Sequence, residues 1–148
     1  MLQNLDEQRL QNICHSLQPV FYDAQSYIVR EGDPVDAMFF ITAGIAWSYP
    51  SSNGDASGLL HAERLERDHF FGEELLDFVL KTPSLPKLPI STRTVKTYKT
   101  LEAFALMAED LRNLLLMNWT HIDKERSEPF AAYVLQVAWR RRQENKKT

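Results

Sequence analysis

The sequence predicts a mainly β domain with flanking helices, an antiparallel β-roll of the jelly-roll kind. Two observations predict it. The middle of the chain consists of short runs of β-forming residues separated by turn residues, a pattern typical of antiparallel rolls and sandwiches. Both ends instead carry apolar residues at helical spacing. With 148 residues the chain is long enough for one domain with its own core.

Residues 1–18 are predicted to form an amphipathic N-terminal helix. Their apolar positions recur at spacings of three, five, three and four, which keeps them close to one helical face. Pro19 is expected to stop this helix, because proline cannot continue the hydrogen-bond ladder. The apolar positions are Leu2, Leu5, Leu10, Ile13 and Leu17.

The β-roll is expected between residues 19 and 111. Its β-rich runs are FYDAQ, SYIVREGD, MFFITAG, IAWSYPSSNGD and STRTVKTYKTLEAFALM. In IAWSYP the alternation of Ile45, Trp47 and Tyr49 predicts a strand with one buried face. The polar run SSNGDASG that follows predicts an exposed hairpin loop.

One segment after the roll has a helical pattern, and one segment within the roll contains three prolines. Residues 112–148 are predicted to be a helical C-terminal segment. Its helical pattern begins directly after Met107 with AEDLRNLLLMNW, and Pro129 separates this pattern from FAAYVLQVAWRRRQENKK. Earlier, DFVLKTPSLPKLPI is predicted to be stiff and non-helical because of its prolines. These prolines are Pro83, Pro86 and Pro89.

Charge is segregated along the chain. The net charge is −3, but residues 140–148 carry +4, which leaves −7 on the rest. This distribution predicts an acidic domain with a basic end and argues against a nucleic-acid-binding surface. No run approaches the roughly 20 apolar residues of a membrane span, the start lacks a signal peptide, and Cys14 has no partner cysteine. We therefore expect a soluble, cytosolic chain without a disulfide.

Motifs for catalysis or metal binding are not recognisable. The four histidines form no close pair, and Gly72 lies between His69 and Glu73 where a helix is expected to begin. No Gly-x-Ser-x-Gly turn and no paired cysteine and histidine motif supports nucleophilic catalysis. The sequence therefore predicts no enzyme, no metal and no cofactor. A metal-dependent enzyme of the cupin type is the weakest alternative.

Four motifs in order carry a family resemblance: SYIVREGDPVDAMFFITAG, FFGEELL, LPISTRTV and LEAFALMAEDL. With them, the chain resembles the cyclic-nucleotide-binding domain of plant cyclic-nucleotide-gated cation channels, from about residue 2 to residue 111 and again at LQVAWRR. The resemblance implies a β-roll that binds cAMP or cGMP, a short phosphate-binding helix between two strands, and a C-terminal helix that acts as a lid.

The FFGEELL motif is where the resemblance implies ribose and phosphate contacts. Gly72 would let the backbone approach the ligand, and the amides of Glu74 and Leu75 would face the phosphate from a helix start. Glu73 matches the family glutamate that accepts a hydrogen bond from the ribose 2′ hydroxyl. On the local pattern alone, the two glutamates are equally well explained as favourable first-turn residues of a helix.

The arginine that the family directs at the phosphate is displaced in this chain. Counting back from Val95, its usual place and the next one are occupied by Ser91 and Thr92. Arg93 comes two residues late, a shift of about 6 to 7 Å that keeps its side chain on the same strand face. Either Arg93 still reaches the phosphate beside two neutral hydroxyls, or it is an ordinary strand arginine that faces solvent.

The C-terminal segment has a basic, aromatic, amphipathic pattern between Phe130 and Arg142. Such a pattern is typical of calmodulin targets and of helices at anionic membrane surfaces. LQVAWRR also partly resembles the IQ motif, which implies calmodulin binding. The residues concerned are Leu135, Gln136, Trp139 and Arg140. The alternative is a lid helix that docks its apolar face on the roll and keeps a solvated basic end.

The sequence thus predicts the regulatory cyclic-nucleotide-binding module of a plant-type ligand-gated cation channel, in which nucleotide and calmodulin binding are coupled to gating. The resemblance implies channel subunits as further partners, a tetrameric parent, and a place at the cytoplasmic face of a membrane, reached only through a pore that this chain lacks. The alternative is an interaction domain that keeps the roll, binds no nucleotide, and serves calmodulin binding or subunit assembly.

Overall fold

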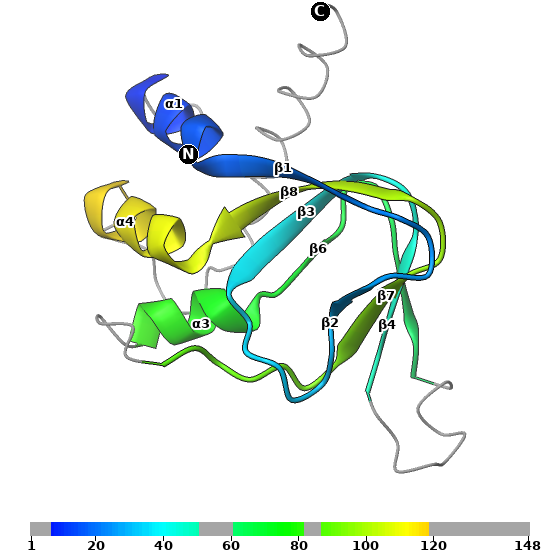
Figure 1. The fold of residues 1–148 in the computed structure, drawn as a ribbon. Coiled ribbons are helices and arrows are strands. Elements are labelled where there is room, and N and C mark those ends of the chain that lie inside the picture. The colour runs from blue at the N-terminus through cyan, green and yellow to red at the C-terminus, as the bar shows by residue number, and fades with distance from the viewer. Residues whose placement is uncertain (1–6, 51–60, 82–86, 119–148) are drawn as a thin grey trace, which may run out of the picture.

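The computed structural model describes residues 7–50, 61–81 and 87–118, which form two four-stranded antiparallel sheets and three helices (Figure 1). The first sheet has the order β1 (Leu17–Tyr22), β8 (Leu101–Met107), β3 (Ala37–Ala43) and β6 (Phe70–Phe71). The second has the order β2 (Tyr27–Val29), β7 (Thr94–Thr97), β4 (Ala46–Tyr49) and β5 (Glu63–Leu65). The helices are α1 (Glu7–Ser16), α3 (Glu74–Lys81) and α4 (Ala108–Asn118). The predicted antiparallel roll with flanking helices is confirmed.

The N-terminal helix ends earlier than its apolar pattern suggested. α1 stops at Ser16, and Leu17 already begins β1. Pro19 therefore lies inside a strand, opposite Phe104 of β8. Because β1 is at the edge of its sheet, the missing N–H of this proline removes no ladder bond that the fold needs.

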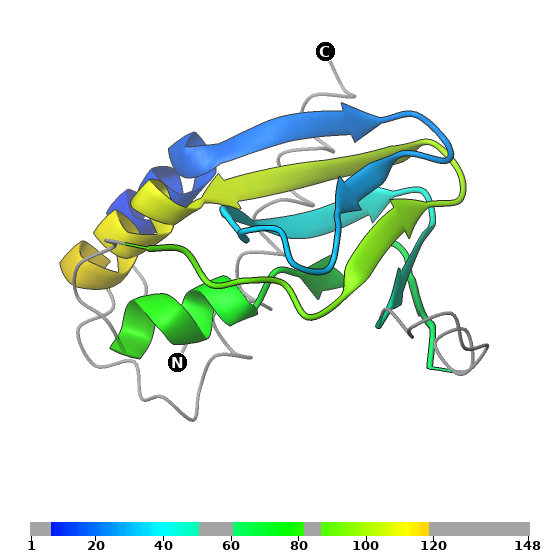
Figure 2. The same ribbon diagram turned by 60° about the horizontal axis from the view of Figure 1, so that its bottom comes forward.

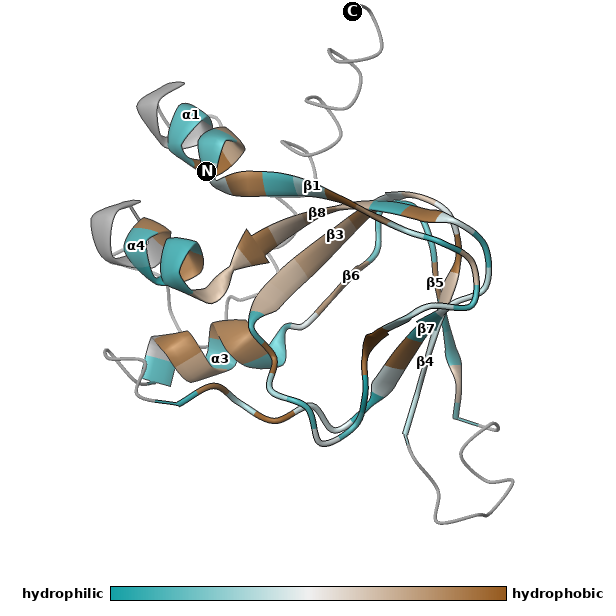
Figure 3. Ribbon diagram, viewed as in Figure 1, coloured by the Kyte–Doolittle hydropathy of each residue, from teal (hydrophilic) through white to brown (hydrophobic). Residues whose placement is uncertain are grey.

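The two inner strands of the first sheet bury both of their faces. Side chains alternate along a strand, so neighbouring residues of β3 and β8 enter two different clusters. The cluster on the helix side includes Met38, Phe40, Phe104 and Leu106. The cluster between the sheets includes Ala37, Phe39, Ile41, Ala103 and Ala105. Figure 3 shows both strands as predominantly apolar ribbons.

The helices gather at one end of the roll, as the two ribbon views show (Figures 1 and 2). α4 packs against both α1 and α3. Their buried residues complete the helix-side cluster with Ile13, Leu75, Leu76, Leu111 and Leu114. Among the residues described, no helix has the length and apolar character needed to cross a membrane.

The segment after GEELL is helical in part, which corrects the prediction of a non-helical DFVLKTPSLPKLPI. α3 continues through Asp77 to Lys81. The first proline of the segment, Pro83, comes two residues after the end of α3, so none of its prolines lies within the helix. Residues 82–86 lie outside the described ranges.

The predicted buried face of β4 is wrong. Ala46 and Ser48 are buried, whereas Trp47 and Tyr49 are only partly buried and lie on the other face. The inward face of β4 borders the space between the sheets, where small side chains fit. Trp47 and Tyr49 each have a polar atom that can remain in contact with water, so the half-exposed outer face suits them. On this face Trp47 lies opposite Lys96 of β7. The predicted hairpin loop after β4 lies outside the described residues.

A cavity between the two sheets

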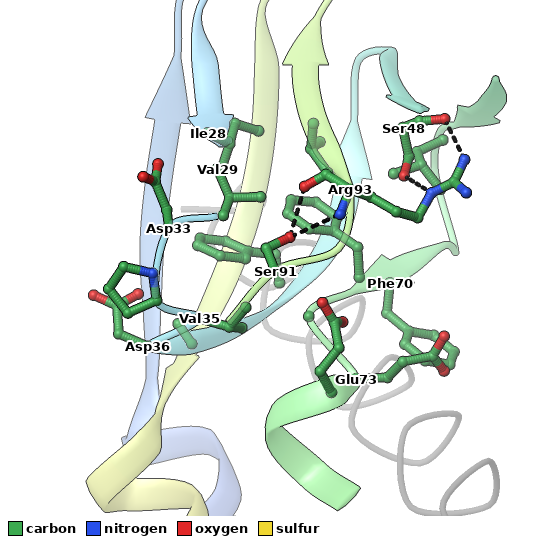
Figure 4. A pocket seen from close by; sticks show the side chains of 18 of the residues that line it. Ile28, Val29, Asp33, Val35, Asp36, Ser48, Phe70, Glu73, Ser91 and Arg93 are labelled. Carbon is green, nitrogen blue, oxygen red and sulfur yellow. Dashed lines mark hydrogen bonds between the residues drawn. The ribbon is translucent and has the colours of Figure 1, made fainter. Parts of the chain in front are cut away.

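A cavity of about 350 Å³ opens between the sheets beside the start of α3 (Figure 4). This volume is within the usual range of small-molecule sites, about 300 to 1,000 Å³. Five parts of the chain contribute most of its walls, and one of them is β2 with Ile28 and Val29. The other four are residues 33–37, the β6–α3 junction, the segment that leads into β7, and the inward faces of the β4–β5 pair.

Backbone hydrogen bonds join the motifs REGDPVD and LPIS at the rim of the cavity. The Gly32 N–H donates to the Ser91 carbonyl at 2.9 Å, and the Ser91 N–H donates to the Asp33 carbonyl at 2.8 Å. The Val35 N–H donates to the Pro89 carbonyl at 2.8 Å. Two segments that lie far apart in the sequence therefore form one edge of the site.

The β6–α3 junction requires a glycine. Gly72 has φ +86°, and a Cβ built on it would lie 2.5 Å from the Ala37 carbonyl oxygen. The junction can therefore pass close to β3 only without a side chain at this position. Glu73 follows directly and points from the start of α3 into the cavity (Figure 4).

Glu74 also lines the cavity, but Leu75 does not. The Leu75 side chain is fully buried in the helix-side cluster, and its N–H donates to the Gly72 carbonyl at 3.1 Å. This N–H group therefore already has an acceptor within the first turn of the helix, and the predicted contact of the Leu75 amide with a phosphate stays a prediction. The ligand roles of Gly72, Glu73 and Glu74 stay predictions.

Arg93 lies on the strand wall of the cavity, held by three hydrogen bonds. Its Nε donates to Ser48 Oγ at 2.8 Å, and its Nη2 donates to the backbone carbonyls of Ser48 and His61, each at 2.8 Å. Figure 4 shows the side chain extending toward Ser48 of β4. The guanidinium is thus bound to protein groups at the edge of the cavity, and its contact with a phosphate stays a prediction.

The two predicted hydroxyls near Arg93 differ in position. Ser91 lines the cavity and is 3% exposed, but its Oγ donates to the Arg93 carbonyl at 2.6 Å and accepts from the Arg93 N–H at 3.2 Å. Thr92 is exposed and is not part of the lining. The structure therefore brings five of the seven predicted residues together around the cavity: Gly72, Glu73, Glu74, Ser91 and Arg93.

Sequence reasoning missed several polar residues of the lining. Asp33 and Asp36 belong to REGDPVD, a motif whose carboxylates were given no role. Ser48 and Glu63 face each other across the β4–β5 pair and both reach the cavity. The lining within the described residues therefore contains five carboxylates and one cationic side chain, Arg93. An anionic ligand would be attracted only at the arginine side and repelled elsewhere.

Metal-binding groups do not assemble in the part of the chain that the structure describes. No three histidine, cysteine, aspartate or glutamate side chains are grouped there in a way that would hold a metal ion. Cys14 is in no disulfide within the described residues, and its partly buried side chain packs against the helix-side cluster. The predicted calmodulin-binding residues, Leu135, Gln136, Trp139 and Arg140, lie outside the described ranges.

Comparison with known proteins shows similarity to plant ion channels. No family model matches the chain. It is 44% identical over 151 residues to cyclic nucleotide-gated ion channel 1 of Arabidopsis thaliana, covering 95% of this chain and 21% of that protein. It is 40% identical over 147 residues to the probable cyclic nucleotide-gated ion channel 10 of the same plant, covering 93% and 20%. The chain thus spans about a fifth of the length of these relatives.

Solved structures share the architecture. The solution structure of the cNMP-binding domain from an Arabidopsis thaliana cyclic nucleotide-regulated ion channel has a TM-score of 0.59 and 41% identity, over 76% of this chain and 82% of that one. The catabolite activator protein of Thermus thermophilus has the same TM-score at 19% identity, over 99% of this chain and 59% of that one, which shows the fold alone.

The sequence identity and the shared architecture agree with each other. Identity of 41% to a domain that the chain covers by 82% is well above the level at which only the fold is shared. The relatives named above at 40% identity or more are ion channels and the cNMP-binding domain of an ion channel. The chain therefore belongs to the family of cNMP-binding domains of plant cyclic nucleotide-gated ion channels.

Proposed function

We propose that the chain binds cAMP or cGMP in the cavity between the sheets, as the regulatory module of a plant-type ligand-gated cation channel. The observation that carries this proposal is the cavity itself, with Glu73 on its helix wall and Arg93 on its strand wall. A ribose hydroxyl and a cyclic phosphate need an acceptor and a cationic donor on the two sides of one site, and these residues supply them.

Each wall has a separate task in this proposal. Glu73 accepts a hydrogen bond from the ribose 2′ hydroxyl. Gly72 permits close approach of the backbone, and the Glu74 amide at the start of α3 faces the phosphate, where the positive end of the helix dipole favours an anion. Arg93 supplies the cation, while Ser91 forms the adjoining wall.

Gating requires that the ligand discriminate between two arrangements of the C-terminal helices, because a ligand shifts an equilibrium only by its differential affinity. α4 packs on α1 and α3 and is the described element through which such a change would begin. Calmodulin is proposed to bind the basic segment around Leu135 and Trp139 on sequence grounds alone. In the parent channel the module would lie at the cytoplasmic face of a membrane, beside other subunits.

The test is a calorimetric titration of the purified chain with cAMP and with cGMP, beside Glu73→Ala and Arg93→Ala. We expect saturable binding that each substitution weakens by about ten- to a hundredfold, the usual worth of a hydrogen bond to a charged group. Glu66→Ala, which removes a carboxylate outside the cavity, is the control and should bind like the parent. Absence of saturable binding in a protein whose circular dichroism shows a folded roll would refute the proposal.

A second candidate is an interaction domain that binds no nucleotide. It is favoured by one observation: three protein acceptors already engage Arg93, and five carboxylates line the same cavity. In that case the chain would bind calmodulin without binding cAMP or cGMP, and Trp139→Ala would abolish calmodulin binding. Retention of calmodulin binding in this variant would exclude the IQ-like segment as the contact.

A further inference from the structure

The inference concerns Ser48, a buried serine that no sequence motif singled out. It lies in β4, is 5% exposed and lines the cavity. Its neighbours across the sheet are Val95 on β7 and Glu63 on β5. A buried hydroxyl is unfavourable unless it is hydrogen-bonded, and the partner that this hydroxyl has is the Nε of Arg93 at 2.8 Å.

Ser48 contacts Arg93 twice, through its side chain and through its backbone. Oγ accepts from Nε, and the carbonyl accepts from Nη2, which also donates to the His61 carbonyl. These bonds use the N–H group of Nε and both N–H groups of Nη2. A guanidinium carries five, so the two on Nη1 remain, and within the described residues Nη1 donates no hydrogen bond.

We propose that Ser48 is a positioning residue for ligand binding: it fixes the guanidinium of Arg93 on the cavity wall so that the Nη1 edge is available to a cyclic phosphate. The proposal rests on the proposed function. An arginine side chain has large rotamer entropy, and a ligand that must order it binds more weakly. Here the protein orders it before the ligand arrives, which compensates in part for the carboxylates on the other walls.

The hydrogen bonds to Ser48 also explain how Arg93, two residues after the position of the family arginine, still lies at the cavity. Arg93 immediately precedes β7, whose residue Thr94 pairs with Tyr49 of β4. The register places Arg93 beside the end of β4, so its long stem can run across to Ser48. The hydroxyl at Ser48 therefore anchors a cation whose backbone position alone does not direct it at the ligand.

The experiment is a double-mutant cycle on nucleotide affinity in the full chain, with cAMP and cGMP as probes. The variants are Ser48→Ala, Arg93→Ala and the double variant, compared with the parent by calorimetry. We expect Ser48→Ala to weaken binding about two- to tenfold, the affinity equivalent of immobilising one long side chain. In the Arg93→Ala background the same substitution should change nothing, because Ser48 acts through the arginine.

Two further variants separate positioning from general stability. Ser48→Thr keeps the hydroxyl and should restore most of the affinity. Ser16→Ala removes a hydroxyl that donates to the Asn12 carbonyl inside α1, away from the cavity, and should leave affinity unchanged. Thermal unfolding of every variant shows whether the fold persists at the titration temperature.

The outcomes are distinct. Tighter binding by Ser48→Ala would mean that the serine competes with the ligand for Arg93, and would overturn the proposal. Equal losses with and without Arg93 would mean that Ser48 acts independently of the arginine, which also overturns it while the proposed function stands. A folded parent chain that binds neither nucleotide would overturn the proposed function and the role of Ser48 together.

Discussion

The two faces of the first sheet are built from side chains of different size. On the helix side, β3 and β8 present Met38, Phe40, Phe104 and Leu106, and these pack against the helices in one buried cluster. On the side between the sheets, the same strands present three alanines among their buried residues. Because alternate positions of one strand serve the two faces, the sequence AFAL in β8 specifies a filled face and an open face at once.

The difference shows how the fold separates stability from binding. Large apolar side chains removed from water stabilise the helix-side cluster, roughly in proportion to the area they bury. Small side chains between the sheets leave room for a ligand and forgo part of that stabilisation. Substitutions on the two faces should therefore have separable effects, with stability changed on one side and ligand affinity on the other.

The largest effect is expected for Phe40→Ala. This ring is fully buried in the helix-side cluster, and its removal should lower the free energy of unfolding by about 4 kcal/mol. Phe39→Ala, one residue earlier, removes a ring stacked on Phe71 at 4.8 Å beside the cavity and should cost nearer 3 kcal/mol. Urea unfolding measures both. Nucleotide affinity of the folded protein should fall only in Phe39→Ala, and a fall in Phe40→Ala would contradict the separation of the faces.

The next effect concerns the close approach of the β6–α3 junction to β3. Gly72→Ala should destabilise by about 3 kcal/mol, from positive φ and from the clash with the Ala37 carbonyl, and should weaken nucleotide binding. Gly32→Ala is the matched control: φ is +93° but the site of its Cβ is open, so we expect about 1 kcal/mol. Similar losses for both glycines would show that the contact with Ala37 is unimportant.

A smaller and opposite effect is expected for Glu63→Gln. This carboxylate lies on the cavity wall opposite Ser48, on the side where Arg93 is held, so it repels an anionic ligand. Its neutralisation should raise cyclic-nucleotide affinity about two- to fivefold at low salt, and less at high salt. Glu66→Gln removes the same charge outside the cavity and should leave affinity unchanged. Calorimetric titrations of both variants with cyclic nucleotide at two salt concentrations test this expectation. Weaker binding by Glu63→Gln would indicate that Glu63 contacts the ligand and does not repel it.

The smallest effect is a pH dependence. Burial, and then the nearby Asp36 carboxylate, raise the pKa of Tyr22 above its usual value of 10.0. The folded state therefore disfavours the tyrosinate, and stability should fall as pH rises above about 10, where the unfolded chain releases the proton first. Tyr22→Phe should flatten this fall, as measured by urea unfolding at pH 8 and pH 10.5. Part of the fall in stability with pH should remain in Tyr22→Phe, because the pKa of Tyr49 is also raised, by burial and by Tyr27.

The roll was predictable because its signals are local. Short β-rich runs, turn residues between them and helical spacing at the ends depend only on neighbouring residues. The buried face of β4 was not predictable in the same way. Hydrophobicity favoured Trp47 and Tyr49, but the inward face is decided by β5, β7 and the cavity, which come later in the chain.

The candidate site shows the same limit. Gly72 and Glu73 could be found because their motif is contiguous and their environment begins in the motif itself. The surroundings of Arg93 could not, because its acceptors on Ser48 and His61 are 45 and 32 residues away in the sequence. Such pairs follow from strand register, which no local pattern specifies.

The pairing of β1 with β8 determines how the roll responds to pulling. Leu17, where the chain enters from α1, lies opposite Leu106, where it leaves toward α4. Tension applied through these helices therefore acts on one end of the antiparallel ladder. The hydrogen bonds between β1 and β8 would then break one after another and not all at the same time. A force that separates the flanking helices should consequently detach β1 from β8 at low load. We expect β1, the edge strand, to be the first part of the roll to unfold.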